Sequence, residues 1–153
     1  MSNKFKLSVL LCSFFFCQQI VAQTDSLRLL CPFENGSGRE PKEAYTWDPP
    51  DKKIIMITKL DTIIRSCINA TVAAVNPTED NRFEVVIYHK NYYFWYYGVA
   101  KSFVKRGDLL KAGQALGAYT PGTEVELRMF EKEEPIDPRK LLDCKTPNDV
   151  IKN

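Results

Sequence analysis

Two glutamates near the end of the chain, Glu124 and Glu126, have the spacing of a pair that can do chemistry together. Residues two apart on a β-strand face the same side, which would place the two carboxylates about 6–7 Å apart. Carboxylate oxygens suit a hard cation such as calcium or magnesium, and Asp51 is the obvious third donor. Calcium usually takes about six or more oxygen ligands, however, and Arg128 can pair with Glu126 on the same side. We therefore favour a charged surface and predict no bound metal and no cofactor.

Histidine is scarce, since His89 is the only one among 153 residues. A Ser-His-Asp arrangement could be built around one imidazole, but a zinc enzyme that needs several could not.

Six aromatic residues follow one another from Tyr92 to Tyr97. On a strand, one half of them faces the core and the other half presents its rings outward. Tyrosine and tryptophan rings can stack on sugar rings or peptide planes while their polar tips stay in water. The candidate binding groove therefore comprises Tyr93, Trp95, Tyr97, Glu124 and Glu126. The alternative is a structural role, with the outer rings covered by the N-terminal extension.

The first 22 residues have the pattern of a secretory signal, with Lys4 and Lys6 before an apolar run over 7–16 and cleavage after Ala22. That run is shorter than the roughly 20 residues of a transmembrane helix. Removing residues 1–22 leaves 21 − 2 = 19 basic residues against 19 acidic ones. A neutral chain lacks the basic surface that nucleic-acid binding needs. We expect a secreted or periplasmic protein with no transmembrane segment after signal cleavage.

Three cysteines remain after this cleavage: Cys31, Cys67 and Cys144. In an oxidising compartment we expect one disulfide and one leftover thiol. Cys31 and Cys144 flank the predicted core, so we favour this pair, although sequence separation alone leaves the other pairings open. Cys67 would then be a free and buried thiol.

The elements that would position these residues are short strands. Residues 23–50 are rich in proline and glycine without a sustained period, which predicts an irregular N-terminal extension. Runs of β-branched and aromatic residues follow, separated by turn residues, at 53–60, 62–75, 82–97, 99–104, 114–119 and 123–130. This spacing predicts a mainly β sandwich or barrel. Residues 64–74 alternate as one half-buried strand, and the one plausible helical piece is a turn at 138–142.

Several of these segments carry a resemblance to a known family. The stretch VKRGDLLKAGQALG at 104–117 is similar to the "V-kk-G-d-x-V-k-k-G-q-x-I-G" segment of LytM/lysostaphin-type zinc peptidases, metallopeptidase family 23. Its glycines permit tight turns, and Leu109 and Leu110 would plug the sandwich between them. Biotinyl and lipoyl carrier domains share this stretch, but the Met-Lys-Met tip typical of such carriers does not occur here.

The neighbouring segments favour the peptidase resemblance. EVVIYHKNYYFWYYGV at 84–99 resembles the upstream hairpin of the family, and PIDP at 135–138 resembles its closing segment. The resemblance covers 51–142 and leaves 143–153 as a C-terminal tail. It implies an antiparallel β-sandwich of the duplicated hybrid motif, or barrel-sandwich hybrid, type.

The same resemblance implies that the chemistry is lost. The family holds zinc and moves protons with residues of H-x-x-x-D, H-x-H and Y-x-H segments. The corresponding positions of this chain are Asp51, Ile55, Glu124, Glu126 and Val99. None of them carries an imidazole, and isoleucine and valine can neither bind a metal nor transfer a proton.

We therefore expect an exported, non-catalytic, peptidase-like domain that acts as a cell-envelope binding or regulatory module for peptidoglycan or a partner protein. The alternative is an active peptidoglycan metallohydrolase whose metal site is built on Asp51, Glu124 and Glu126. The sequence leaves open whether residues 24–50 cover the ancestral cleft.

Overall fold

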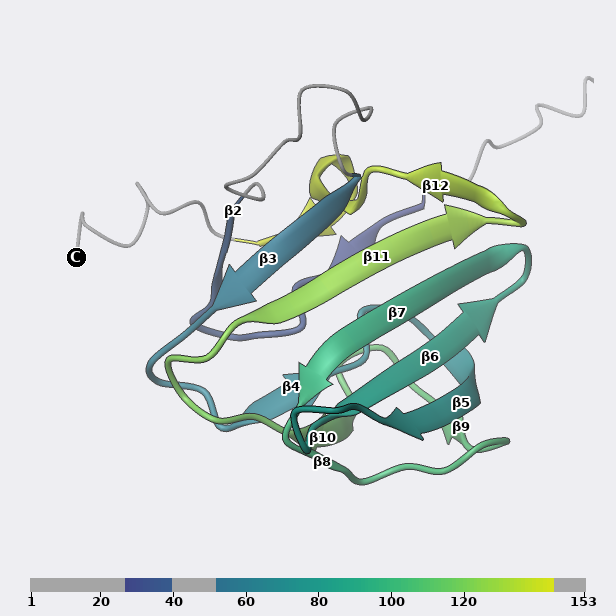
Figure 1. The fold of residues 1–153 in the computed structure, drawn as a ribbon. Helices are drawn as coiled ribbons and strands as arrows, with labels where there is room; N and C mark the ends of the chain where they lie inside the picture. Colours follow the sequence, from purple (N-terminus) through teal and green to yellow (C-terminus); the bar gives the residue numbers. More distant parts are fainter. Residues whose placement is uncertain (1–26, 40–51, 145–153) are drawn as a thin grey trace, which may run out of the picture.

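Thirteen short strands and one 3-10 turn make up the computed structural model, which describes residues 27–39 and 52–144. Eight strands form one large sheet, seen at the front of Figure 1. Its order is β2-β3-β11-β7-β6-β5-β9, with β12 paired to β11. The bounds in that order are Ser37–Arg39, Lys53–Ile57, Val125–Glu131, Tyr92–Val99, Phe83–His89, Ala70–Pro77, Leu109–Leu110 and Glu134–Ile136.

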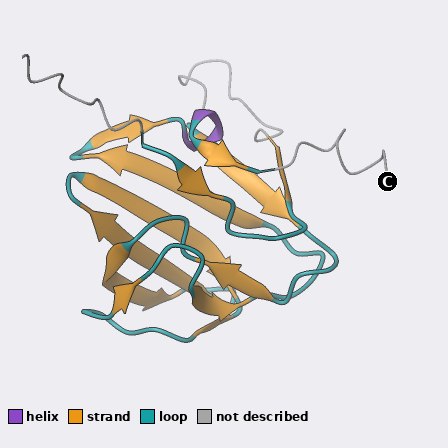
Figure 2. Ribbon diagram, turned by 180° about the vertical axis from the view of Figure 1, so that it is seen from behind, coloured by secondary structure: helices purple, strands orange, loops and turns teal. Residues whose placement is uncertain are grey.

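A smaller sheet forms the second layer, which Figure 2 shows from behind. It consists of β4 (Ile63–Arg65), β10 (Ala115–Ala118) and β8 (Lys101–Ser102). The described strands of these two sheets pair antiparallel and do not close into a barrel. The predicted mainly β sandwich is therefore confirmed, and the predicted helical turn near 138–142 is the 3-10 turn η1 (Pro138–Lys140).

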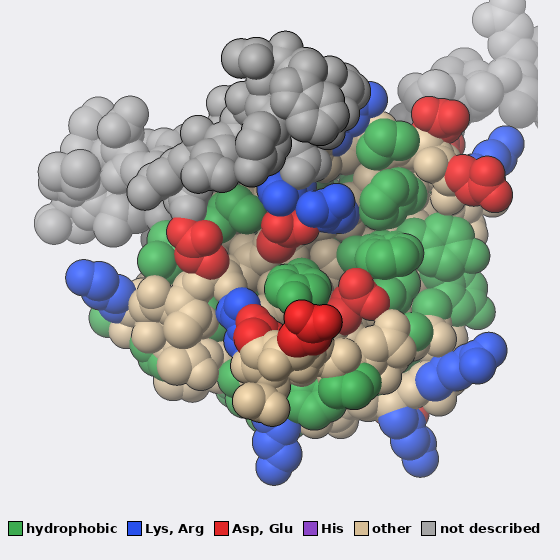
Figure 3. Space-filling model, in the orientation of Figure 1, with side chains coloured by type: hydrophobic (Ala, Val, Ile, Leu, Met, Phe, Trp, Pro, Cys, Tyr) green, Lys and Arg blue, Asp and Glu red, His purple; other side chains and the backbone are tan. Residues whose placement is uncertain are grey.

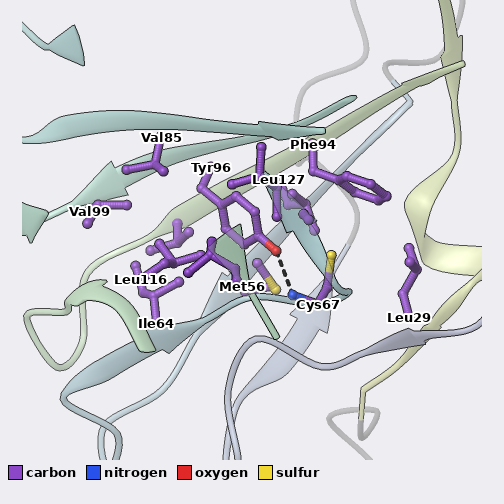
Figure 4. Close-up of a cluster of buried hydrophobic side chains, with 14 of the residues drawn as sticks. Leu29, Met56, Ile64, Cys67, Val85, Phe94, Tyr96, Val99, Leu116 and Leu127 are labelled. Atoms are coloured by element: carbon purple, nitrogen blue, oxygen red, sulfur yellow. Dashed lines mark hydrogen bonds between the residues drawn. The ribbon is translucent and has the colours of Figure 1, made fainter. Parts of the chain in front are cut away.

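The core lies between the layers and is filled by alternate residues of the large sheet. Phe94 and Tyr96 of β7 are completely buried, as are Leu127 and Met129 of β11. Figure 4 shows Tyr96 crossing this core toward Cys67, whose backbone N–H donates to the tyrosine oxygen at 2.9 Å. The alternation predicted for the run 92–97 places Phe94 and Tyr96 inside and the odd-numbered rings outside.

The single strand predicted over 64–74 is wrong, because the chain changes sheets at that point. β4 ends at Arg65, and β5 starts at Ala70 in the other layer. The Ser66 hydroxyl donates to the carbonyl of Ile68 at 2.6 Å and stabilises the connecting turn. Apolar residues alternate with polar ones both before and after this turn, so the apolar pattern of the sequence does not reveal where β4 ends.

The prediction that both leucines of β9 plug the sandwich is half wrong. Leu110 pairs with Ala70 and is buried, whereas Leu109 pairs with Thr71 and is 78% exposed. Neighbouring residues of a strand face opposite sides, so only one of the two can reach the core.

The described part of the N-terminal extension is more regular than predicted. β1 (Leu29–Leu30) runs parallel to β13 (Leu142–Asp143), and β2 adds an edge strand beside β3. β13 crosses the predicted boundary between the domain and the tail, so Asp143 and Cys144 lie in the segment assigned to the tail. The signal segment 1–22 and residues 40–51, including Asp51, lie outside the described residues.

The predicted cysteine pairing is confirmed. Cys31 and Cys144 form a disulfide that spans 113 positions of the sequence, and Cys67 is free and buried. Within the described residues, no helix combines the length and apolar character that crossing a membrane requires.

Candidate functional site

The outer face of the large sheet brings together residues that lie far apart in the sequence. Strand register places Ile55 opposite Glu126, and Glu126 opposite Tyr97. The next row runs from Lys53 through Arg128 to Trp95. Residues directly opposite each other in antiparallel strands share a face. Two of the positions that resemble the family's ligands, Ile55 and Glu126, therefore share one surface with the predicted aromatic groove.

The Glu126 carboxylate is held by two cations on this surface. Its Oε2 lies 2.8 Å from Nζ of Lys53, and its Oε1 accepts a hydrogen bond from Nε of Arg128 at 2.5 Å. The predicted pairing of Arg128 with Glu126 is confirmed. Both carboxylate oxygens are therefore engaged with positive charges, which is an unfavourable environment for a divalent cation.

The remaining ligand positions do not complete a zinc site. Ile55 lies beside Glu126 and offers no donor atom. Glu124 precedes β11, and its backbone carbonyl accepts from Nη1 of Arg82 at 3.0 Å. Over residues 27–39 and 52–144, no three His, Cys, Asp or Glu residues are grouped so that they could hold a metal ion. The described residues thus do not fit the zinc ion that the family resemblance implies.

Val99, at the position of the Y-x-H histidine, points into the core. A bulge at Gly98, whose φ is +103°, separates the pair Tyr97–Glu84 from the pair Val99–Phe83. The extra residue turns Val99 to the inner face, where it is completely buried. His89 lies at the end of β6, opposite Tyr92 and next to the hairpin turn.

The aromatic residues predicted to face outward do so. Tyr93, Trp95 and Tyr97 are each 39% exposed. The ring centroids of Trp95 and Phe130 lie 5.7 Å apart, and the guanidinium of Arg82 lies 6.0 Å from the centroid of Tyr97. These rings form one contiguous surface across β7 and β11. Figure 3 shows that hydrophobic side chains gather on this face of the molecule beside acidic and basic ones.

Two hollows adjoin along this surface and share Trp95 and Phe130. One, of about 630 Å³, is lined by Lys90, Asn91, Tyr93, Trp95, Phe130, Lys132 and Glu133. The other, of about 380 Å³, is lined by Glu84, Trp95, Tyr97, Glu126, Arg128 and Phe130.

The predicted groove residues other than Glu124 line these two hollows. Sequence reasoning missed Phe130 and the residues of the two hairpin turns. The backbone N–H of Lys132 donates to the carbonyl of Asn91 at 2.7 Å and holds these turns together. Phe130 has the same parity as Glu126 and Arg128 on β11, and this parity in the sequence would have predicted that Phe130 lies on the same face.

The free thiol is not a nucleophile. Burial raises the pKa of Cys67 to about 12, and the hydrogen bonds around it offset only part of that effect. A thiol with such a pKa carries almost no thiolate at neutral pH. Burial likewise raises the pKa of the Tyr96 hydroxyl. This pair therefore belongs to the core and does no chemistry.

Comparison with known proteins identifies the fold through solved structures. No protein-family model matches the sequence, and a search of curated proteins found no match. Csd3 from Helicobacter pylori matches with a TM-score of 0.64 and 17% identity over 78% of this chain and 34% of that chain. This chain thus spans about a third of the length of Csd3.

Two further structures match almost over their whole length. A chain of the SpoIIQ–SpoIIIAH pore-forming complex matches with a TM-score of 0.60 and 15% identity, over 83% of this chain and 98% of that one. The catalytic domain of the prophage-encoded M23 protein EnpA from Enterococcus faecalis matches with a TM-score of 0.56 and 18% identity, over 71% and 95%. The chain therefore has the fold of the M23, LytM/lysostaphin-type, peptidases, in a degenerate form at the ligand positions that the structure describes.

Proposed function

We propose that this protein is an exported, non-catalytic, M23-like domain that binds a cell-envelope ligand on the outer face of its large sheet. The ligand is peptidoglycan or an envelope protein. The observation that carries the proposal is the contiguous surface of Tyr93, Trp95, Tyr97 and Phe130, which lines two hollows beside the positions where the family would hold zinc.

The chemistry of the site supports binding over catalysis. Lys53 and Arg128 each form an ion pair with one carboxylate oxygen of Glu126, which disfavours the approach of a metal ion. Partly exposed aromatic rings in a hollow are the kind of residue that contributes most to binding free energy. The described part of the extension does not cover them, because Leu29 and Phe33 pack into the core and β2 lies at the sheet edge.

A protein partner has support of its own. One of the matching folds occurs in a complex of two named proteins, SpoIIQ and SpoIIIAH. The competing function is an unusual metallohydrolase built on Asp51, Glu124 and Glu126. The ion pairs of Glu126 argue against this function.

Sedimentation with purified peptidoglycan tests the proposal. Trp95→Ala should weaken binding about thirtyfold, because a central aromatic contact contributes about 2 kcal/mol or more. Phe103→Ala is the matched control, since Phe103 is also an exposed aromatic residue but lies outside both hollows. If both variants bound peptidoglycan as tightly as the unaltered protein, the proposal that the aromatic hollows bind it would be refuted.

A digestion assay on the same peptidoglycan separates the binding module from the hydrolase. We expect no released muropeptides with or without a chelator. Release that a chelator abolishes, and that Glu126→Gln also abolishes, would establish the hydrolase instead. If peptidoglycan does not bind at all, capture of an envelope protein that depends on Trp95 supports the partner-protein form of the proposal.

A further inference from the structure

The connection around β8 and β9 concentrates positive charge on one segment. Residues 101–111 contain Lys101, Lys105, Arg106 and Lys111, all exposed, and a single acid, Asp108. The Asp108 carboxylate accepts a hydrogen bond from the backbone N–H of Lys105 at 2.9 Å. None of the four basic side chains forms an ion pair within the described part of the chain. The segment has a local charge of 4 − 1 = +3 in a chain whose net charge is +2.

Two large apolar side chains project from the same segment. Phe103 is 52% exposed, and Leu109, at 78%, is the most exposed large hydrophobic residue of the described chain. Leu109 is exposed because it pairs with Thr71 on the outer face, while Val104 between the two packs against the core. The segment thus exposes Phe and Leu among several basic residues, a combination that neither core packing nor solubility requires.

Hydrogen bonds to the body of the protein hold the segment in place. The N–H of Phe103 donates to the carbonyl of Leu116, and the N–H of Gly107 donates to the carbonyl of Val72. The N–H of Asp108 donates to the carbonyl of Lys105 at 3.1 Å and closes a tight turn, in which Gly107 has a φ of +90°. The segment runs along the lower edge of the molecule in Figures 1 and 2, away from β12 and η1. Its side chains are therefore presented with little loss of backbone entropy on binding.

The basic and apolar side chains together indicate the chemical class of the partner. Basic residues alone would suit any polyanion, but buried leucine and phenylalanine gain free energy only in an apolar phase. A bilayer with anionic headgroups supplies both, since it attracts lysine and arginine at its surface and accepts apolar side chains just below. We propose that residues 101–111 attach the protein peripherally to an anionic lipid membrane. This site is distinct from the aromatic hollows and does not depend on their function.

Co-sedimentation with vesicles tests this attachment. The protein should start at Gln23, because the apolar run 7–16 would bind lipid by itself, and all described strands lie after that point. Vesicles of phosphatidylglycerol and phosphatidylethanolamine should sediment the protein, whereas vesicles of phosphatidylcholine should sediment much less. Binding to the anionic vesicles should weaken as salt is raised.

Variants of the segment locate the site. Lys105→Gln with Arg106→Gln should weaken binding about thirtyfold, since each basic side chain near an anionic surface contributes about 1 kcal/mol. Leu109→Ser should weaken it about tenfold or more through loss of inserted apolar groups. The matched controls are Lys59→Gln and Leu60→Ser, because Leu60 is 75% exposed in a different loop. Equal thermal midpoints of the variants would show that all of them fold.

Three outcomes would overturn the proposal: no sedimentation with anionic vesicles, equal sedimentation with neutral ones, or equal losses from the segment variants and the controls. Binding to a soluble polyanion such as polyglutamate as strong as that to anionic vesicles, and unaffected by Leu109→Ser, would also overturn the lipid assignment.

Discussion

Breaking the disulfide between Cys31 and Cys144 should cost a large part of the stability of this domain. The bond closes a loop across 113 positions, nearly the whole described chain. In the chain-entropy treatment, a loop of this size is worth about 5 kcal/mol, because the unfolded chain regains its freedom when the bond is cut. For a domain of this length, each kcal/mol corresponds to roughly 3–4 °C in Tm, so we expect a fall of about 15–20 °C.

The structure around the bond explains why little else would compensate. β1 and β13 pair over only two residues each, yet Leu29 of β1 is almost completely buried. The N–H of Leu30 also donates to the carbonyl of Cys67 at 2.9 Å. Without the bond, the burial of Leu29 depends on this small sheet and on the hydrogen bond from Leu30 to Cys67, and the segment must be ordered at its full entropic cost.

Thermal unfolding with and without a phosphine reductant measures the effect, and thiol titration confirms reduction. The double variant Cys31→Ala, Cys144→Ala should melt at the midpoint of the reduced protein and should not respond to reductant. Cys67→Ala is the control, and it should keep the full response. A midpoint that falls by less than about 3 °C on complete reduction would refute the loop-entropy reasoning for this chain.

Three smaller perturbations test the core, the bulge and the acid response. Tyr96→Phe leaves a buried backbone N–H without its acceptor and should cost about 1–3 kcal/mol in denaturant unfolding, and an unchanged midpoint would contradict the hydrogen bond. Gly98→Ala adds a Cβ 2.8 Å from a carbonyl oxygen at a φ of +103°, and should cost at least about 1–2 kcal/mol by the same measurement. The hydrogen bond from Thr78, and to a smaller extent that from Arg82, lowers the pKa of Asp80 from 3.8 to about 2. Asp80 thus contributes stability above its unfolded pKa that is lost as the pH falls toward 2, and thermal midpoints between pH 5 and pH 2 should fall less in Asp80→Asn than in the unaltered protein.

Much of the fold could be predicted because local pattern decides it. The turn at Lys90 and Asn91 separates two runs of β-formers, so the β6–β7 hairpin and the parity of its rings follow from the sequence. The break after Arg65 could not be predicted, since the apolar alternation continues through a turn that the Ser66 side chain stabilises. Strand β2 was missed because an edge strand needs only the free edge of β3 to form.

The candidate site was predictable only as far as single strands allow. Alternation on β7 was enough to place Tyr93, Trp95 and Tyr97 on the outer face. Phe130 joins them because of the register between β7 and β11, which is a tertiary property. The inward turn of Val99 depends on a bulge at Gly98, and a sequence pattern with period two does not reveal an inserted residue.

The two ion pairs on Glu126 also bear on how this chain could evolve. A histidine at position 126 would be a neutral ligand placed between Lys53 and Arg128, and their charges would repel an incoming zinc ion. Removing either lysine or arginine first would weaken the ion-pair network while giving no metal in exchange. A single substitution to histidine at position 126 therefore does not create a metal site while both cations remain in place.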